Sequence, residues 1–418
     1  MSVLPLQSRC KKPIAARCLA VTLMLGLASR AQAETNAPSL DRTAVARLAA
    51  ARGPAATVSA LRVAEARAGT IGAGTFAPQN PELSAFMGPR FLSSTTGVDY
   101  FLGLAWPFDV SGAPSKRADA AADRVRAAES DAAAVRQSLI ADALEQWVSA
   151  RSDEARVDLE TARLAVDRTV LRAAEVRKAA GTVGDGDVAL ARVLVAQARA
   201  RLTTAEHRRE GDLARLRARV GLAPATPVDV TGSLVPTEPR PLTVLVARLR
   251  SQPGVVRSLD VMRAAESEAR LQNRVGYPIP RVTASTGRDP DGYVHVGLDV
   301  PIPVYQRNQT NAAVADARAK TAEAEHGSAL LLGDAELRAA YAAYEGARDA
   351  FRTLDEVAPS VDDAEHLAIR SYELGQSSLS DLATARREAA AARVDRLEAE
   401  ITLARARIAL DALTGEGP

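Results

Sequence analysis

The chain has 418 residues, a formal net charge of +2 at pH 7 and 4% aromatic residues. This nearly balanced charge excludes the strong basic bias that nucleic-acid-binding proteins usually carry. Both cysteines, Cys10 and Cys18, lie in an N-terminal segment that we expect to be removed. The mature chain is therefore predicted to have no disulfide, no thiolate metal ligand and no thiol nucleophile.

Residues 1–33 are predicted to be a cleaved secretory signal peptide. Basic residues up to Arg17 precede an apolar run over residues 18–27 and then Ala31-Gln32-Ala33, the usual order of charged, hydrophobic and small residues. A membrane anchor is the alternative, but a run of about ten residues is too short to span a bilayer. The mature chain is expected to begin near Glu34 and to be exported. It is expected to carry no lipid anchor, because the residues before Cys18 do not resemble a lipoprotein cleavage site.

The rest of the chain is predicted to contain two copies of one unit, residues 34–223 and 242–418, joined by a proline-rich linker over residues 224–241. Identical residues recur at a constant offset of 194 positions, without insertions, and glycine and proline dominate them. Because glycine and proline determine where a backbone turns, both copies are expected to turn at the same places. The matched pairs include Gly103 and Gly297, Pro107 and Pro301, Gly181 and Gly375, Asp187 and Asp381, and Arg192 and Arg386.

Each copy is predicted to form a helix, two strands and then a very long helical hairpin. Residues 115–180 contain neither glycine nor proline, and as one helix they would extend for roughly 100 Å. Val157, Leu164 and Leu171 recur every seven residues, which indicates a coiled-coil seam. The equivalent stretch of the second copy contains four helix-disfavouring residues, at which we expect kinks or breaks: Gly327, Gly333, Gly346 and Pro359.

The predicted strands alternate between an apolar face and a small or polar face. The apolar face carries Val98, Tyr100, Leu102, Leu104, Trp106 and Phe108 in the first copy, and Val294, Val296, Leu298 and Val300 in the second. Less regular partner strands are expected at about residues 82–91 and 280–287. Two interpretations stay open at this point: half-buried strands of a soluble sheet, or barrel strands whose apolar face contacts lipid.

Barrel strands would require several chains. After the signal region no stretch approaches 18 consecutive apolar residues, which excludes membrane-spanning helices but not membrane strands. Four strands cannot close a membrane barrel, and an open sheet edge is not tolerated in lipid. Three chains would supply twelve strands.

No catalytic site, cofactor site or metal site is predicted. The four histidines, His207, His295, His326 and His366, are far apart and show no metal-ligand spacing. His295 is expected to face a barrel lumen, and the other three are expected on solvated helix faces. The glycine-rich residues 69–74 follow a helical stretch but precede no nucleotide-binding unit, so they are interpreted as a linker. We therefore do not expect an enzyme.

The predicted hairpin tips carry residues that resemble a known family. Residues 372–382, followed by Ala385, resemble the helix-turn-helix signature of the TolC-type outer-membrane efflux proteins, and residues 181–188 are their first-copy counterpart. Residues 80–83, 111–117 and 303–309 resemble the heavy-metal (resistance-nodulation-division) branch of that family. The resemblance covers nearly the whole mature chain.

The resemblance implies a mainly α protein with a small β part, built from duplicated coiled-coil hairpins and four strands per chain. Three such chains would form a homotrimer with a twelve-stranded β-barrel in the outer membrane of a Gram-negative bacterium and a twelve-helix periplasmic tunnel. The duct would work in a tripartite efflux pump with a periplasmic adaptor (membrane-fusion) protein and an inner-membrane pump. The implied cargo is metal cations or small toxic compounds.

In this family the tip turns form the periplasmic mouth, where the adaptor docks. The resemblance therefore implies five docking residues: Gly181, Asp187, Gly375, Ser378 and Asp381. Either glycine can adopt the left-handed conformation that ends a helix, and either aspartate can cap or favour the N-terminus of the next helix. Asp381 also matches the first position of an acidic ring at the mouth. Thr384 stands where some members carry a second acid, so strong cation selectivity of the mouth is not implied.

Two other classes of exported protein share some of these features. A periplasmic adaptor would carry one helical hairpin flanked by split lipoyl-like strands, whereas this chain duplicates its hairpin. A soluble coiled-coil scaffold would leave the repeated amphipathic strands unexplained. The sequence therefore favours the outer-membrane exit duct.

Overall fold

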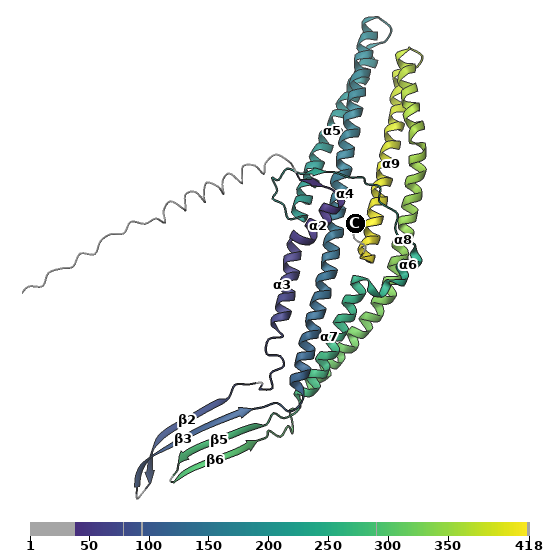
Figure 1. Cartoon of the computed structure of the whole chain (residues 1–418). Coiled ribbons are helices and arrows are strands. Elements are labelled where there is room, and N and C mark those ends of the chain that lie inside the picture. Colours follow the sequence, from purple (N-terminus) through teal and green to yellow (C-terminus); the bar gives the residue numbers. More distant parts are fainter. Residues whose placement is uncertain (1–37, 78, 93–94, 290, 416–418) are drawn as a thin grey trace, which may run out of the picture.

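The protein is an elongated molecule with a small sheet at one end and two long helical hairpins at the other (Figure 1). A computed structural model describes residues 38–77, 79–92, 95–289 and 291–415. The predicted signal peptide lies outside the described residues. Short elements surround the middle of the long helices, so the molecule has three levels: sheet, middle region and hairpin tips (Figure 1).

The two halves of the chain contain the same kinds of element in the same order. The first half forms α2 (Arg42–Arg52), α3 (Pro54–Ala68), β2 (Glu82–Leu92), β3 (Thr95–Pro107), α4 (Ala113–Ala179) and α5 (Asp185–Arg219). The second half forms α6 (Leu242–Ala247), η1 (Leu249–Ser251), α7 (Pro253–Val275), β5 (Arg281–Arg288), β6 (Gly292–Asp299), α8 (Gln309–Glu373) and α9 (Leu379–Thr414). The long helix predicted over residues 115–180 is confirmed as α4.

Helix α8 is not broken, so the prediction of breaks is wrong, but the helix does change direction, as the prediction of kinks allows. It continues for 65 residues through Gly327, Gly333, Gly346 and Pro359. A proline inside a helix costs about 3 kcal/mol and each glycine about 1 kcal/mol, but packing against a neighbouring helix can offset such costs. Buried Tyr344 and Phe351 of α8 supply such packing against Leu403 of α9. The helix changes direction beside α6 (Figure 1), and there Gly333 lies against Leu249 of η1.

The four main strands form one antiparallel sheet in the order β2-β3-β5-β6. The first half of the chain contributes β2 and β3, and the second half contributes β5 and β6. Leu104 of β3 lies opposite Leu83 of β2 and Ala284 of β5, and Ala284 lies opposite Val296 of β6. Strands of both halves are therefore neighbours in one sheet, and β2 and β6 are its edge strands among the described residues.

The main core lies at the middle level, where α2, α4, α5 and α9 meet. A two-residue parallel pairing joins β1 (Ser39–Leu40) to β4 (Asp229–Val230). The buried Trp147 of α4 donates its indole N–H to the carbonyl oxygen of Leu40 at 2.9 Å. Leu144, Val148, Leu216 and Ile401 pack around this contact, together with others of the cluster. Within the described part of the chain, no helix is both long and apolar enough to cross a membrane.

Candidate functional site

The tip of the first hairpin closes α4 with a left-handed glycine. Gly181 has a φ of 73°, and the backbone N–H of Thr182 donates to the carbonyl oxygen of Arg177 at 2.9 Å. Such a turn satisfies carbonyl groups that the end of a helix leaves without partners. Helix α5 then begins at Asp185 after Gly184, which offers no side-chain cap. Asp187 lies in the first turn of α5, where its negative charge favours the helix N-terminus.

The tip of the second hairpin has the same turn but a complete cap. Gly375 has a φ of 76°. Ser378 Oγ accepts a hydrogen bond from the backbone N–H of Asp381 at 3.2 Å, and Asp381 Oδ2 accepts one from the backbone N–H of Ser378 at 3.2 Å. This reciprocal pair is a capping box. The Ser378 hydroxyl, followed by its backbone N–H, holds the pKa of the Asp381 carboxyl below its ordinary value, so Asp381 is an anion at neutral pH.

One arginine ties the first tip to the second. The guanidinium of Arg177, near the end of α4, donates from Nη1 to the carbonyl oxygen of Tyr372 in α8 at 3.1 Å and lies 4.8 Å from the centroid of the Tyr372 ring. Tyr372 is buried in a cluster with Val188 of α5 and Leu379 of α9. Sequence reasoning missed Arg177, because the position equivalent to it in the second copy is Ser371 and the repeat therefore gave no signal.

A buried ion-pair network lies below the tips. Arg386 of α9 contacts Asp167 of α4 and, at 3.2 Å, Glu365 of α8, and the three side chains are 5–11% exposed. Arg393 completes the network by contacting Glu365 at 2.5 Å and Asp362 at 2.6 Å. The network therefore links both hairpins. The repeat marked Arg386 through its match with Arg192, but Arg192 pairs only with the exposed Glu175, at 3.5 Å.

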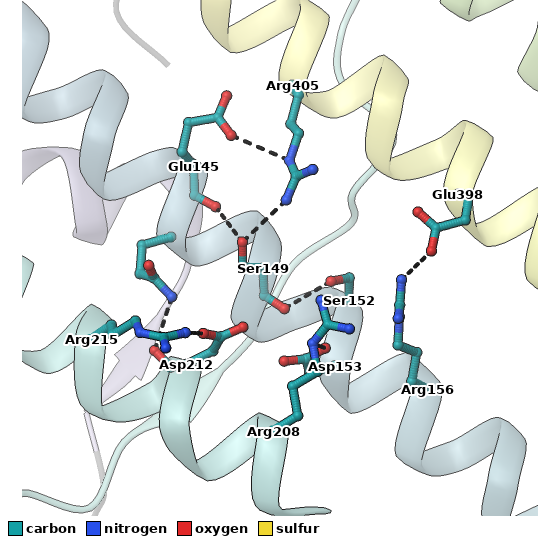
Figure 2. A network of polar contacts seen from close by, with 11 residues as sticks. Glu145, Ser149, Ser152, Asp153, Arg156, Arg208, Asp212, Arg215, Glu398 and Arg405 are labelled. Atoms are coloured by element: carbon teal, nitrogen blue, oxygen red, sulfur yellow. Dashed lines mark hydrogen bonds and ion pairs between the residues drawn. The ribbon is translucent and has the colours of Figure 1, made fainter. Parts of the chain in front are cut away.

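A second polar network holds α4 against α5 and α9 at the middle level (Figure 2). Arg405 of α9 contacts Glu145 of α4 at 3.3 Å, and Arg156 of α4 contacts Glu398 of α9. Asp153 of α4 is 1% exposed and contacts Arg208 of α5 at 3.1 Å.

Asp153 also lies beside a second acid, Asp212 of α5. Burial first, and then a hydrogen bond with Asp212, raise the pKa of Asp153 to about 6. Below that pH, the pair of Asp153 and Asp212 holds a proton. The repeat gave no signal for this pair, because the equivalent second-copy positions are Ala347 and Ala406.

The predicted apolar positions within the strands share one face of the sheet, whereas Phe108 lies beyond the end of β3. The cross-strand register aligns Leu102 with Thr286 and Val294, Leu104 with Ala284 and Val296, and Trp106 with Val282 and Leu298. Val300 follows directly after the end of β6. The side chains of this apolar face are between 44% and 78% exposed: Val98, Tyr100, Leu102, Leu104, Trp106, Val294, Val296, Leu298 and Val300.

The opposite face of the sheet carries polar and small residues and also the aromatic residues Phe86, Phe101 and Tyr293. Arg90 of β2 forms an ion pair with Asp99 of β3, and Arg281 of β5 contacts Glu82 of β2 at 3.7 Å. His295 belongs to this polar face and stacks on Tyr293, with ring centroids 4.7 Å apart. His326 instead contacts the Ser258 hydroxyl at 2.9 Å between α7 and α8. Among the described residues, no group of three or more His, Cys, Asp or Glu side chains is arranged to hold a metal ion.

Comparison with known proteins shows the family to which the chain belongs. The family model of the outer membrane efflux proteins matches residues 30–222 and 245–416. The cobalt-zinc-cadmium resistance protein CzcC of Cupriavidus metallidurans is 26% identical over 321 residues, which cover 75% of this chain and 76% of that protein.

Solved outer-membrane channels have the same fold. CusC superposes with a TM-score of 0.76 at 18% identity, over 91% of this chain and 94% of CusC. The open-state channel MtrE of Neisseria gonorrhoeae superposes with a TM-score of 0.72 at 19% identity, over 90% of this chain and 89% of MtrE. Channels of this family are passive ducts rather than enzymes, are trimeric, and work with adaptor and inner-membrane pump partners. The chain therefore belongs to the outer membrane efflux protein family, and it serves as the exit duct of an efflux pump in the outer membrane of a Gram-negative bacterium.

Proposed function

We propose that three copies of this chain assemble into one passive duct, with a twelve-stranded β-barrel and a twelve-helix tunnel. One observation carries this proposal: the apolar positions of both halves share one exposed face of a single sheet. Such a face suits lipid, but the edge strands β2 and β6 would then expose unpaired backbone groups, which lipid does not tolerate. Joining β6 of each copy to β2 of the next would remove every open edge.

Internal duplication explains how one chain supplies a third of such a duct. We infer that residues 34–223 and 242–418 are the two repeats and that residues 224–241 are the linker. In support, the hairpins α4/α5 and α8/α9 end in glycines with nearly equal φ values, and each half adds one strand hairpin to the sheet. Three copies would then supply twelve strands and twelve long helices.

The trimer is tested by mass measurement in mild detergent. The mature chain, extracted from outer-membrane fractions, is expected to have the mass of three copies and to form pores in lipid bilayers. Extraction without detergent would instead favour a soluble scaffold or an adaptor. A stable monomer that still supports efflux would overturn the proposal.

The apolar face of the sheet is proposed to contact lipid, with Tyr293, His295 and Asp299 directed into the lumen. Arginine in place of Val296 is expected to cost about 2 to 4 kcal/mol of barrel stability if this position lies near the bilayer midplane. Arginine in place of His295, the next residue on the opposite face, is expected to be tolerated. Equal trimer yields of Val296→Arg and His295→Arg in outer membranes would show that the facing is wrong.

The hairpin tips are proposed to be the docking site of the periplasmic adaptor, with Gly181, Asp187, Gly375, Ser378 and Asp381 as its residues. In support, both turns lie at the end of the molecule farthest from the sheet (Figure 1), and the Ser378 and Asp381 side chains are at the surface. Three copies of ionised Asp381 would form an acidic ring at the mouth of the tunnel. Substitutions at Ser378 are expected to weaken adaptor crosslinking and resistance while trimer abundance is kept. Full crosslinking and resistance in such strains, or loss of the trimer, would refute the docking assignment.

The proposed cargo is metal cations or small toxic compounds. The relative CzcC is named for resistance to cobalt, zinc and cadmium, and carrying this over to the present chain is part of the proposal. In a deletion strain, the chain is expected to restore growth on cobalt, zinc or cadmium salts when it is expressed with its adaptor and pump. No gain of resistance to any of the three metals would contradict this cargo.

A further inference from the structure

Three aromatic side chains lie in one row across the polar face of the sheet. The register places Phe86 of β2 opposite Phe101 of β3, Phe101 opposite Gly287 of β5, and Gly287 opposite Tyr293 of β6. The row therefore crosses all four strands. The ring centroids of Phe86 and Phe101 are 5.8 Å apart, and His295, in the adjacent row, stacks on Tyr293.

Two glycines allow these rings to lie against the sheet. A Cβ atom built on Gly103 would lie 2.7 Å from the Phe101 ring, and one built on Gly287 would lie 2.6 Å from the Tyr293 hydroxyl oxygen. The two rings thus cover the backbone of the central strands, where any other residue would place a side chain. Rings in this position turn a face, rather than only an edge, toward the space in front of the sheet. They also stabilise the strand glycines that they cover, which is a purely structural role.

Acidic side chains outnumber basic ones on and around this face. Arg90 pairs with Asp99, and Arg281 contacts Glu82. The remaining carboxylates are Asp299 at the end of β6 and, in the turn between β5 and β6, Asp289 and Asp291, which also attract Arg90. Arg288 lies opposite Tyr100 at the end of β5, but its charge also acts on Asp99, so five acidic side chains lie on or around this face against three basic ones. A surface that combines aromatic rings with excess negative charge favours cations.

We propose that Phe86, Phe101, Tyr293 and His295 form an aromatic belt that binds weakly hydrated organic cations, such as quaternary ammonium compounds, inside the duct. This inference rests on the proposed function, because the belt faces a lumen only if three copies close with the apolar face toward lipid. Aromatic faces attract quaternary ammonium groups, whereas small divalent cations give up their water reluctantly. The belt therefore adds organic cations to the proposed cargo and makes the duct itself a point of discrimination.

The test compares two ring deletions with a matched control. In Phe101→Leu/Tyr293→Leu, two of the four belt rings are replaced by aliphatic side chains. In Tyr100→Leu, one ring is removed from the next residue of the same strand, on the apolar face. Potassium currents through the purified trimer are recorded in planar bilayers while tetraethylammonium is added on the side of the strand turns. The double variant is expected to lose about 5- to 30-fold in tetraethylammonium affinity, as two exposed cation–π contacts would predict. The Tyr100→Leu variant is expected to match the wild type.

Two further measurements separate binding from structure. Saturation-transfer NMR of tetraethylammonium with the same detergent-solubilised trimers needs no open tunnel, and its signal is expected to fall only in the double variant. The variant Phe101→Tyr/Tyr293→Phe keeps both rings and is expected to bind as the wild type does. A purely structural role would change trimer yield or potassium current without changing tetraethylammonium affinity.

The outcomes distinguish the belt from the duct. If the wild type and the double variant bind tetraethylammonium equally, or if Tyr100→Leu loses as much affinity, the belt is refuted while the trimer and its current persist. If the wild-type chain forms neither a trimer nor a pore, the proposed duct is refuted instead.

Discussion

The two hairpin tips follow the same backbone course and differ in their side chains. Gly181 and Gly375 turn the chain with φ values of 73° and 76°. At the start of the next helix, however, the first tip has Gly184 and the second has Ser378 with its capping box. The turn, where only glycine is free of strain, is therefore the same at both tips, whereas the cap differs.

The same divergence appears lower in the hairpins. Arg386 is buried between two carboxylates, while its counterpart Arg192 makes one exposed contact. The first hairpin buries the acid pair Asp153 and Asp212, and the second has alanines at the equivalent positions. These buried charged side chains therefore lie at different distances from the tips: Arg386 of the second hairpin lies near the tip, and the acid pair of the first hairpin lies at the middle level. The predictions below test this comparison.

The largest expected difference is between the two equivalent arginines. Arg386→Met would leave the buried Asp167 without its partner and Glu365 with Arg393 alone, and removing one member of a buried ion pair typically costs about 3 to 5 kcal/mol. Arg192→Met removes only an exposed pair, for which we expect less than about 1 kcal/mol. Urea unfolding of the purified protein, followed by helical circular dichroism, measures both. Similar losses of unfolding free energy in the two variants would mean that Arg386 and Arg192 contribute equally to stability.

The acid pair predicts a pH-dependent difference between the hairpins. Burial and the Asp212 hydrogen bond raise the pKa of Asp153 from 3.8 to about 6, so in this window the folded chain binds more protons than the unfolded chain. The free energy of unfolding must therefore fall as pH rises from about 4 to about 6, and the full penalty is present above pH 6. Asp153→Asn is expected to stabilise the protein at pH 7 by on the order of 1 kcal/mol and to have no effect below pH 4.

The control for this prediction transfers the second hairpin's residues to the first. Asp153→Ala/Asp212→Ala reproduces the Ala347 and Ala406 pattern and is expected to remove the same pH dependence. The measurement is the unfolding temperature of the wild type and of the double variant between pH 4 and pH 7. A wild-type protein whose stability is flat across this range would contradict the assignment.

The two turn glycines are expected to respond alike, because their backbone conformations are alike. A valine at either position would be held in the left-handed region at a cost of roughly 1 to 2 kcal/mol. A Cβ atom at Gly181 would meet no heavy atom within 4 Å, and one at Gly375 would lie 3.8 Å from Arg177 Nη2, so contacts add little. Thermal unfolding of Gly181→Val and Gly375→Val measures the cost. A clearly larger loss at one tip would show that the turns are not equivalent.

The smallest effect concerns the caps. Gly184→Ser would place a serine three residues before Asp187 and is expected to stabilise the first tip by a few tenths of a kcal/mol. Ser378→Gly is expected to destabilise the second tip by a similar amount. Amide hydrogen exchange at the start of α5 and α9 is sensitive enough to detect both. Stability changes of opposite sign in the two variants would support the difference between the two caps, and changes of the same sign would contradict it.

The hydrophobic periodicity and the positions of glycine and proline made most of the fold predictable from the sequence. The ion pairs between residues far apart in the sequence could not be predicted. The alternation of Val294, Val296 and Leu298 located β6 and its faces, because a strand has a period of two residues. The network around Arg386 could not be found in this way, since Asp167 and Arg386 are 219 residues apart and ion pairs across helices have no fixed spacing. The expected breaks in α8 failed for a related reason: packing on α9 offsets the local cost of Pro359.

The pairing of β1 with β4 has a consequence for the order in which the exported chain folds. Ser39 and Thr231, whose hydroxyl oxygens are 2.8 Å apart, are separated by 192 residues, and the residues between them include the whole α4/α5 hairpin. Because a chain that enters the periplasm N-terminus first delivers Leu40 long before Val230, the first strand must wait for its partner while the hairpin can already close. The apolar cluster around Trp147 also includes Ile401 of α9, so this core can close only after both halves of the chain have crossed the inner membrane.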